Sequence, residues 1–258
     1  MSSMSAVQIV HHGSIALVEF ERPPHNHITV QLARELADAF DAVDANPELR
    51  CSVLASGGKS FCAGADFNAP RSEDSLAQEG VEALYEQAVR MFAVRKPIVA
   101  ALQGAAIGAG LGLALVADFR VAAPEARLAA NFVKLGFHPG FGITHTLPRL
   151  IGPQRASLMC LTGRRIKAED ALGFGLIDQI APIEELRTAA LQLAAEIGEN
   201  APLAVQATRA TLRAELAAQV QAQTAKEFVQ QAMLRKTADF AEGVRAVQER
   251  RPGRFIGA

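Results

Sequence analysis

Along the first 180 residues, the hydrophobic positions switch repeatedly between the pattern of a buried strand and that of an amphipathic helix. Helices are predicted where apolar residues recur every three or four positions, as at Leu32, Leu36, Phe40 and Val43 behind the capping residue Thr29. Short apolar runs predict strands at residues 7–9, 15–20, 51–55, 97–102, 119–122 and 127–131. This alternation favours an α/β fold.

The pattern changes after residue 182, where strand signals end. Residues 184–197, 202–221 and 224–250 are typical of helices and are rich in Ala, Gln, Glu and Arg. We therefore predict a core at residues 1–182 and a helical region at residues 183–258. The helical region carries more apolar surface than one core needs, which predicts a homo-trimer or hexamer, and its stripe includes Leu203, Val205, Leu212 and Leu216.

One apolar segment, residues 98–117, is about as long as a membrane-spanning helix requires. Gln103 and Gly104 interrupt it where a turn would lie. We predict a buried strand, a glycine turn and then a buried helix that runs to Asp118, with no membrane span.

Charge and cysteine content narrow the function classes. Lys and Arg number 26 against 27 Asp and Glu, so the net charge of −1 lacks the basic excess of a nucleic-acid-binding protein. Cys51, Cys62 and Cys160 cannot all pair within one chain, which favours a reducing compartment. The first six residues lack a secretory pattern, so we expect a cytoplasmic protein.

Two small-residue segments indicate places where backbone comes close to a ligand, namely residues 63–66 and 104–112. A helix that begins near Ala109 would direct its free N–H groups and positive dipole end at the second segment. One N–H donor from each segment would stabilise an oxyanion. Two alternatives are glycines that serve only packing, and a dinucleotide site, for which Leu113 stands where a third glycine is needed.

Further short motifs occur in a fixed order over most of the chain. They are Arg22-Pro23 with Asn26, residues 61–66, residues 96–100, Gln103-Gly104 with Gly108 and Gly110, Asp118, Leu135-Gly136 with Pro139, Gly140 and Gly142, residues 161–164, and Ala171 with Gly175-Leu176-Ile177. In this order the motifs resemble the enoyl-CoA hydratase/isomerase (crotonase) family.

The resemblance implies a spiral of ββα units, a C-terminal helical region that makes trimers, and an acyl-CoA thioester as substrate. Coenzyme A then belongs to the substrate, and no separate cofactor and no metal is expected. By matching positions, the oxyanion donors would be Ala65 and Ala109, beside Gly108. The family's coenzyme A groove would fall on Pro24, His25, Ala63, Asp66 and Phe67.

The sequence departs from the family's hydratases at two positions. Their two glutamates, which handle the water, correspond to Gly112 and Phe132, in a substrate pocket that also includes Pro139 and Gly140. Hydration needs a base for water and an acid for the α-carbon, so classical hydration is not expected. The chain should instead process a thioester enolate by another route. A non-catalytic acyl-CoA binder, a hydrolase and a decarboxylase of the same fold remain alternatives.

Residues 131–140 are similar to the decarboxylating branch used in polyketide β-branching, but its Tyr/Lys pair and C-terminal His are not found. His138 is our candidate for a remaining proton-transfer group, because histidine exchanges protons near neutral pH, and His145 is a second candidate. His138 packing at a subunit interface is the alternative. Cys62 lacks an adjacent activating histidine, and His25 and His27 lack metal-ligating partners, so we expect buried packing and a solvated loop respectively.

Overall fold

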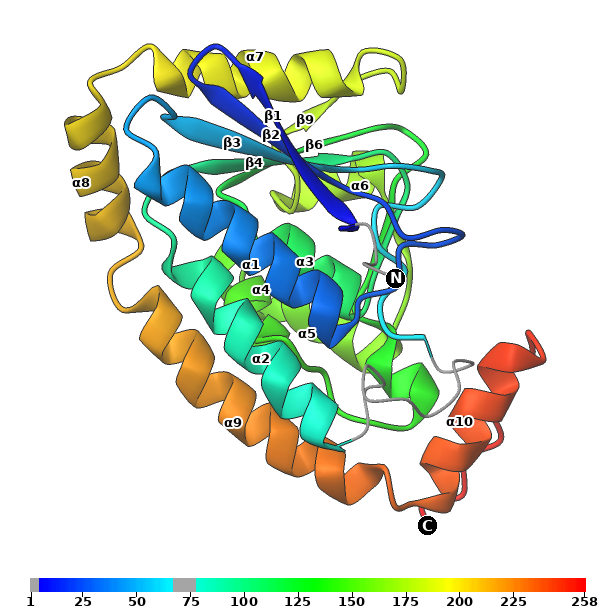
Figure 1. The fold of residues 1–258 in the computed structure, drawn as a ribbon. Helices are drawn as coiled ribbons and strands as arrows, with labels where there is room; N and C mark the ends of the chain where they lie inside the picture. Colours follow the sequence, from blue (N-terminus) through cyan, green and yellow to red (C-terminus); the bar gives the residue numbers. More distant parts are fainter. Residues whose placement is uncertain (1–4, 67–77) are drawn as a thin grey trace.

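The computed structural model describes residues 5–66 and 78–258, and the predicted α/β fold is confirmed within them (Figure 1). Phe67, predicted for the coenzyme A groove, lies outside the described residues. The main sheet has the strand order β1-β2-β3-β4-β6-β9. Its strands are β1 (Val7–His12), β2 (Ile15–Phe20), β3 (Cys51–Ser56), β4 (Ile98–Leu102), β6 (Phe119–Ala122) and β9 (Gln179–Ile180).

Strands β1 and β2 form an antiparallel hairpin, and each later neighbour in the main sheet is parallel. A second, small sheet pairs three short strands, β5 (Ala105–Ile107), β7 (Arg127–Ala129) and β8 (Ile166–Lys167). The sequence analysis missed β5 and β8, because strands of three and two residues are too short to show an alternating pattern.

Helices connect the parallel strands and then form the C-terminal region. In chain order they are α1 (Val30–Ala45), α2 (Gln78–Ala93), α3 (Ala109–Val116), the 3-10 helix η1 (Asn131–Leu135), α4 (Ile143–Ile151), α5 (Pro153–Thr162), α6 (Ala168–Phe174), α7 (Leu186–Gly198), α8 (Pro202–Leu212), α9 (Leu216–Leu234) and α10 (Ala238–Gln248). The predicted cap is confirmed, because Thr29 Oγ1 accepts a hydrogen bond of 3.1 Å from the Leu32 amide.

The main sheet is covered on both faces, as Figure 1 shows for α7 on one side and α1 with α2 on the other. On the α7 side, a small cluster joins Val53 and Val99 of the sheet to Leu186 and Ala190 of α7. The larger cluster lies on the other side and includes the buried faces of α1, α2, α3 and α4. Covering both faces is what makes the parallel strands continuously apolar rather than alternating.

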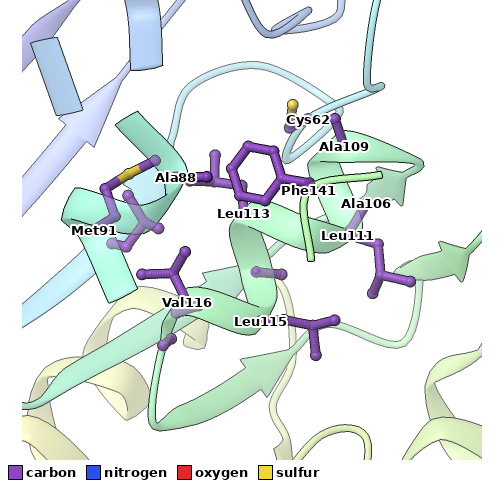
Figure 2. Close-up of a cluster of buried hydrophobic side chains, with 14 of the residues drawn as sticks. Cys62, Ala88, Met91, Ala106, Ala109, Leu111, Leu113, Leu115, Val116 and Phe141 are labelled. Carbon is purple, nitrogen blue, oxygen red and sulfur yellow. The ribbon is translucent and has the colours of Figure 1, made fainter. Parts of the chain in front are cut away.

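The apolar segment 98–117 is buried as strand and helix, as predicted. Every residue of β4 and of α3 is buried, with β5 inserted between them (Figure 2). In the part of the chain that the structure describes, no helix combines the length and the hydrophobicity needed to cross a membrane.

The C-terminal helices are shorter than predicted. The prediction of one continuous helix at residues 202–221 is wrong. Helix α8 ends at Leu212, and α9 begins at Leu216 after Glu215, whose φ is 63°. The helix expected at residues 224–250 also breaks, where Thr237 caps α10 by accepting from the Phe240 amide. Figure 1 shows α9 running along α2 and α10 turning away from its end.

The C-terminal end of α3 is fixed by a buried ion cluster. Asp118 accepts hydrogen bonds from Arg209 Nε at 3.0 Å and Arg213 Nη1 at 2.8 Å, both from the α8–α9 region. It also accepts one from the Ile98 amide at 2.8 Å. Burial alone would raise the pKa of Asp118, but the charges of Arg213 and Arg209 hold it below its ordinary value. The helical region is thus bonded to the helix that leads into the site.

Candidate functional site

Two glycine-containing loops meet because the strands before them pair. Cys62 bridges to Ala106 of β5, where the Cys62 amide donates to the Ala105 carbonyl at 2.9 Å. The Ile107 amide donates back to the Cys62 carbonyl at 3.0 Å. This short parallel pairing brings residues 63–66 beside residues 107–109, as the sequence predicted for the two small-residue segments.

Gly64 is required at the point of closest approach. Its φ is 82°, and a Cβ added there would lie 2.6 Å from the carbonyl oxygen of Ile107 and 3.6 Å from the Ala109 nitrogen. Any side chain would therefore collide with the backbone of the neighbouring loop. The Gly64 carbonyl accepts from the Ile28 amide at 2.9 Å, which fixes the orientation of the loop.

Ala65 and Ala109 provide the two amides of interest. Ala109 is the first residue of α3, so its N–H has no acceptor within the helix and points out of the positive end of the helix dipole. Among the residues that the structure describes, neither the Ala65 nor the Ala109 amide donates to another backbone carbonyl. Two such donors beside one cavity can bind an oxygen that carries negative charge.

A cavity of about 150 Å³ opens between these two loops. Of the predicted site residues it collects Ala63, Ala65, Asp66, Gly108, Ala109 and Phe132. Sequence reasoning missed Asn131 and the wall that α10 supplies with Val244, Val247 and Gln248. The spacing of the two valines places them on one face of the helix, but no pattern in the sequence says what that face covers.

The other predicted site residues do not line this cavity. Pro24 and His25 are exposed, and His138 is half-buried, with its Nδ1 atom 2.7 Å from the Pro139 carbonyl. A Cβ on Gly140 would meet Tyr85 Oη and Gln231 Nε2, so this glycine faces α2 and α9. Gly112 faces Phe141. The roles given to these residues from the sequence remain predictions.

The cavity wall is mainly apolar. The rings of Phe132 and Phe137 meet edge to face with centroids 5.5 Å apart, and Phe137 meets Phe240 of α10 in the same way at 5.3 Å. The ionisable side chains among the described lining residues are His27 and Asp66. The described part of the chain gathers no cluster of three or more His, Cys, Asp or Glu side chains that could hold a metal ion.

His27 corrects one sequence-based interpretation. We expected a solvated loop here, yet His27 is half-buried and lines the cavity. Its Nδ1 atom lies 3.2 Å from the Gly64 carbonyl, which favours a proton on Nδ1 because a carbonyl oxygen can only accept. Cys62 is buried as expected, and its burial raises the pKa of the thiol to about 12, so it is not a ready nucleophile.

Comparison with known proteins gives a consistent result over the whole chain. The family model described as enoyl-CoA hydratase/isomerase matches residues 11–257. A crotonyl-CoA hydratase of Syntrophomonas wolfei is 32% identical over 245 residues, which cover 94% of both chains. A carnitinyl-CoA dehydratase of Citrobacter koseri is 33% identical over 210 residues, covering 81% of this chain and 80% of that protein.

Solved structures agree on the fold. The crystal structure of an enoyl-CoA hydratase/isomerase from Pseudoalteromonas atlantica superposes with a TM-score of 0.86 at 27% identity. The superposition covers 97% of this chain and 100% of that chain. The crotonase-type fold expected from the motif order is therefore confirmed.

Proposed function

Because the chain belongs to the enoyl-CoA hydratase/isomerase family, we propose that it binds an acyl-CoA thioester with the carbonyl oxygen between the Ala65 and Ala109 amides. The observation that carries the proposal is the meeting of the Gly64–Ala65 and Gly108–Ala109 segments at the edge of one cavity. In this family-based assignment, coenzyme A is part of the substrate and no separate cofactor or metal takes part.

Two amide donors suit a thioester that loses a group from its α-carbon. When a base takes a proton from that carbon, or when an α-carboxylate departs as CO₂, the bonding electron pair stays behind, moves onto the carbonyl oxygen and forms an enolate. Donors already aimed at this oxygen stabilise the charge, and one such donor contributes about 3 kcal/mol to the transition state. The dipole of α3 acts in the same direction, because Ala109 stands at its positive end.

Classical hydration is not part of the proposal, although relatives carry hydratase and dehydratase names. Water must be deprotonated as it adds, and the α-carbon must receive a proton. The two positions expected to hold the carboxylates are Gly112, which has no side chain, and Phe132, which is apolar. We propose a reaction that forms a thioester enolate without activating water, such as a double-bond shift or a decarboxylation.

The proposal is tested with a matched pair of variants at Ala109. Proline is tolerated at the first position of a helix but lacks the N–H, so Ala109→Pro removes the donor while α3 remains. Ala109→Gly keeps the donor and is the control. Turnover of crotonyl-CoA, a 3-enoyl-CoA and a malonyl-type CoA is measured beside binding of each thioester and of free coenzyme A.

We expect turnover of the 3-enoyl-CoA or the malonyl-type CoA, reduced about 10²–10³-fold in Ala109→Pro and nearly unchanged in Ala109→Gly. Full activity in a folded Ala109→Pro protein would contradict the donor assignment. Binding without turnover of any thioester would identify a non-catalytic acyl-CoA binder. Release of free coenzyme A with an unchanged acyl group would identify a thioester hydrolase.

The proposal extends to the coenzyme A groove, the compartment and the assembly. The coenzyme A portion would run along Pro24, His25, Ala63 and Asp66, and the protein would work in the cytoplasm. We also propose a homo-trimer or hexamer, which is supported by apolar side chains that one chain leaves uncovered. Leu203 and Leu212 are 81% and 69% exposed. Sedimentation that shows only monomer at micromolar concentration would exclude the assembly.

A further inference from the structure

A side chain at position 112 would need the space that Phe141 already fills. A Cβ added to Gly112 would lie 2.6 Å from Cδ1 of Phe141 and 2.7 Å from its Cβ and Cγ. The backbone fixes the position of Cβ, so turning the ring to another rotamer leaves the 2.7 Å collision with that atom. Phe141 is completely buried, which leaves its ring no free direction. Residue 112 can therefore carry a side chain only if Phe141 moves or becomes smaller.

The loop that carries Phe141 is held firmly in place. Phe141 has a φ of 63°, an uncommon conformation for a bulky residue that persists only when the surroundings impose it. On one side, the Gln231 side chain donates from Nε2 to the His138 carbonyl at 2.8 Å. Its Oε1 accepts from the Tyr85 hydroxyl at 3.0 Å. On the other side, Glu227 accepts from the Gly142 amide at 2.8 Å.

The Phe141 ring fills the space along α3 next to Gly112, one turn beyond the cavity-lining residue Ala109. Gly112 lies three residues after Ala109, so both positions are on the same face of the helix. Figure 2 draws the Phe141 ring in one buried cluster with Ala109 and Leu113 of α3 and with Ala88 and Met91 of α2. The cavity at Ala109 is about 150 Å³, well below the roughly 300–1,000 Å³ of ordinary ligand pockets.

We propose that Phe141 is the specificity-determining residue of this site, because its ring fills the space into which the cavity would otherwise extend along α3 and so restricts the site to short acyl groups. The same ring keeps position 112 free of any side chain. The inference rests on the proposed function for its acyl ligand, but the exclusion between positions 112 and 141 holds whatever ligand binds.

The first experiment tests this exclusion without any ligand. Gly112→Ala, Phe141→Ala and the double variant are compared by melting temperature. Replacing a helical glycine with alanine normally stabilises a protein, and Gly173→Ala in α6 is the control because nothing lies within 4 Å of its added Cβ. We expect Gly173→Ala to raise the melting temperature and Gly112→Ala to lower it.

In the Phe141→Ala background, Gly112→Ala should raise the melting temperature or leave it unchanged. If Gly112→Ala lowers the melting temperature equally with and without the Phe141 ring, the two positions do not compete for space and the inference fails. Phe141→Leu replaces Phe141→Ala in this cycle if the smaller variant does not fold, with a partial effect expected.

The second experiment measures the acyl-length profile. Dissociation constants for coenzyme A, butyryl-CoA and octanoyl-CoA are determined for the natural chain, Phe141→Ala and Phe40→Ala, which also deletes a buried ring but within α1. We expect the natural chain to bind butyryl-CoA at least tenfold more tightly than octanoyl-CoA. Phe141→Ala should remove that preference, and Phe40→Ala should keep it.

The outcomes separate the two proposals. If the natural chain binds neither thioester, the proposed function is wrong, whereas the melting experiment still decides whether positions 112 and 141 exclude each other. If the natural chain binds both lengths equally well, or if folded Phe141→Ala keeps the preference for the short chain, thioester binding stands and the role of Phe141 is wrong.

Discussion

Ala109 in the first turn of α3 and Gly112 in the second lie on the same face of the helix, but their surroundings differ. In the first turn, Ala109 lines a cavity beside a second loop that Gly64 allows to come close. At the second turn, Gly112 lies against the buried ring of Phe141. Under the proposed function, the part of the site that stabilises charge is kept, while the positions that would move protons to and from water carry no carboxylate.

The largest predicted effect is on the rate of crotonyl-CoA hydration, which tests this contrast directly. Each general acid–base group contributes about 10²–10⁴-fold, so a site without both carboxylates should hydrate crotonyl-CoA at least ~10⁴-fold more slowly than one that has them. The measurement is kcat/KM with crotonyl-CoA beside an efficient hydratase that carries both glutamates. A rate within tenfold of that enzyme would show that the second turn supports hydration after all.

The next largest predicted effect is on the unfolding free energy, at Asp118 just beyond the C-terminal end of α3. Asp118→Asn leaves Arg209 and Arg213 buried without their counter-charge, and removing one partner from such a cluster costs about 3–5 kcal/mol of unfolding free energy. Urea denaturation measures it. The control is Asp41→Asn, whose pair with Arg90 is exposed and should contribute less than about 1 kcal/mol. Equal losses in the two variants would contradict the anchoring role.

A smaller effect concerns Glu227, which holds the loop that carries Phe141. Burial raises the pKa of this carboxyl to about 7, although hydrogen bonds from Thr144 and Gly142 lower it. Between about pH 4.5 and 7 the folded chain therefore keeps a proton that the unfolded chain has lost. The unfolding free energy should fall as the pH rises through this window, by on the order of 3 kcal/mol in total.

Glu227→Gln cannot titrate, so the advantage of the natural chain over this variant should shrink between pH 5 and pH 8. The control is Glu215→Gln, which alters an exposed side chain at the start of the same helix. Denaturation midpoints at several pH values supply the comparison. A gap between the natural chain and Glu227→Gln that does not vary with pH would show that Glu227 titrates normally.

The smallest effect is expected at His138. Since the cavity lining includes His27 but not His138, His138→Gln should change kcat by less than about threefold, and His27→Gln should change it more. The kcat and its pH profile are measured on whichever thioester turns over. A loss of about 10²-fold in His138→Gln, with thioester binding retained, would instead support the proton-transfer role predicted from the sequence.

Much of the fold could be predicted because it depends on local patterns. The helix behind Thr29 and the strand at residues 119–122 follow from spacing within a few residues. The break between α8 and α9 could not be predicted, because Arg213-Ala214-Glu215 contains neither Gly nor Pro and all three residues are compatible with a helix. At this break Arg209 and Arg213 bond to Asp118, a partner more than 90 positions earlier that no local pattern reveals.

The site divides in the same way. Gly64 and Gly108 were visible because a residue without a side chain in an apolar segment marks a close approach of backbone. The role of Phe141 could not be predicted, because it depends on contact with Gly112, which lies 29 positions earlier in the sequence. The wall supplied by Val244 and Val247 was hidden for the same reason, since only the packed chain brings α10 to residues 63–66.

The interlock of Gly112 and Phe141 also limits how this chain can change over generations. A carboxylate at position 112 is tolerated only after the aromatic at position 141 has gone, and losing the aromatic first leaves a void in the core. Each substitution lowers stability when made alone, and the second substitution relieves the clash that the first would otherwise face. Descendants of this chain should therefore keep both residues or replace both, and ancestral reconstruction should find few sequences with only one of them changed.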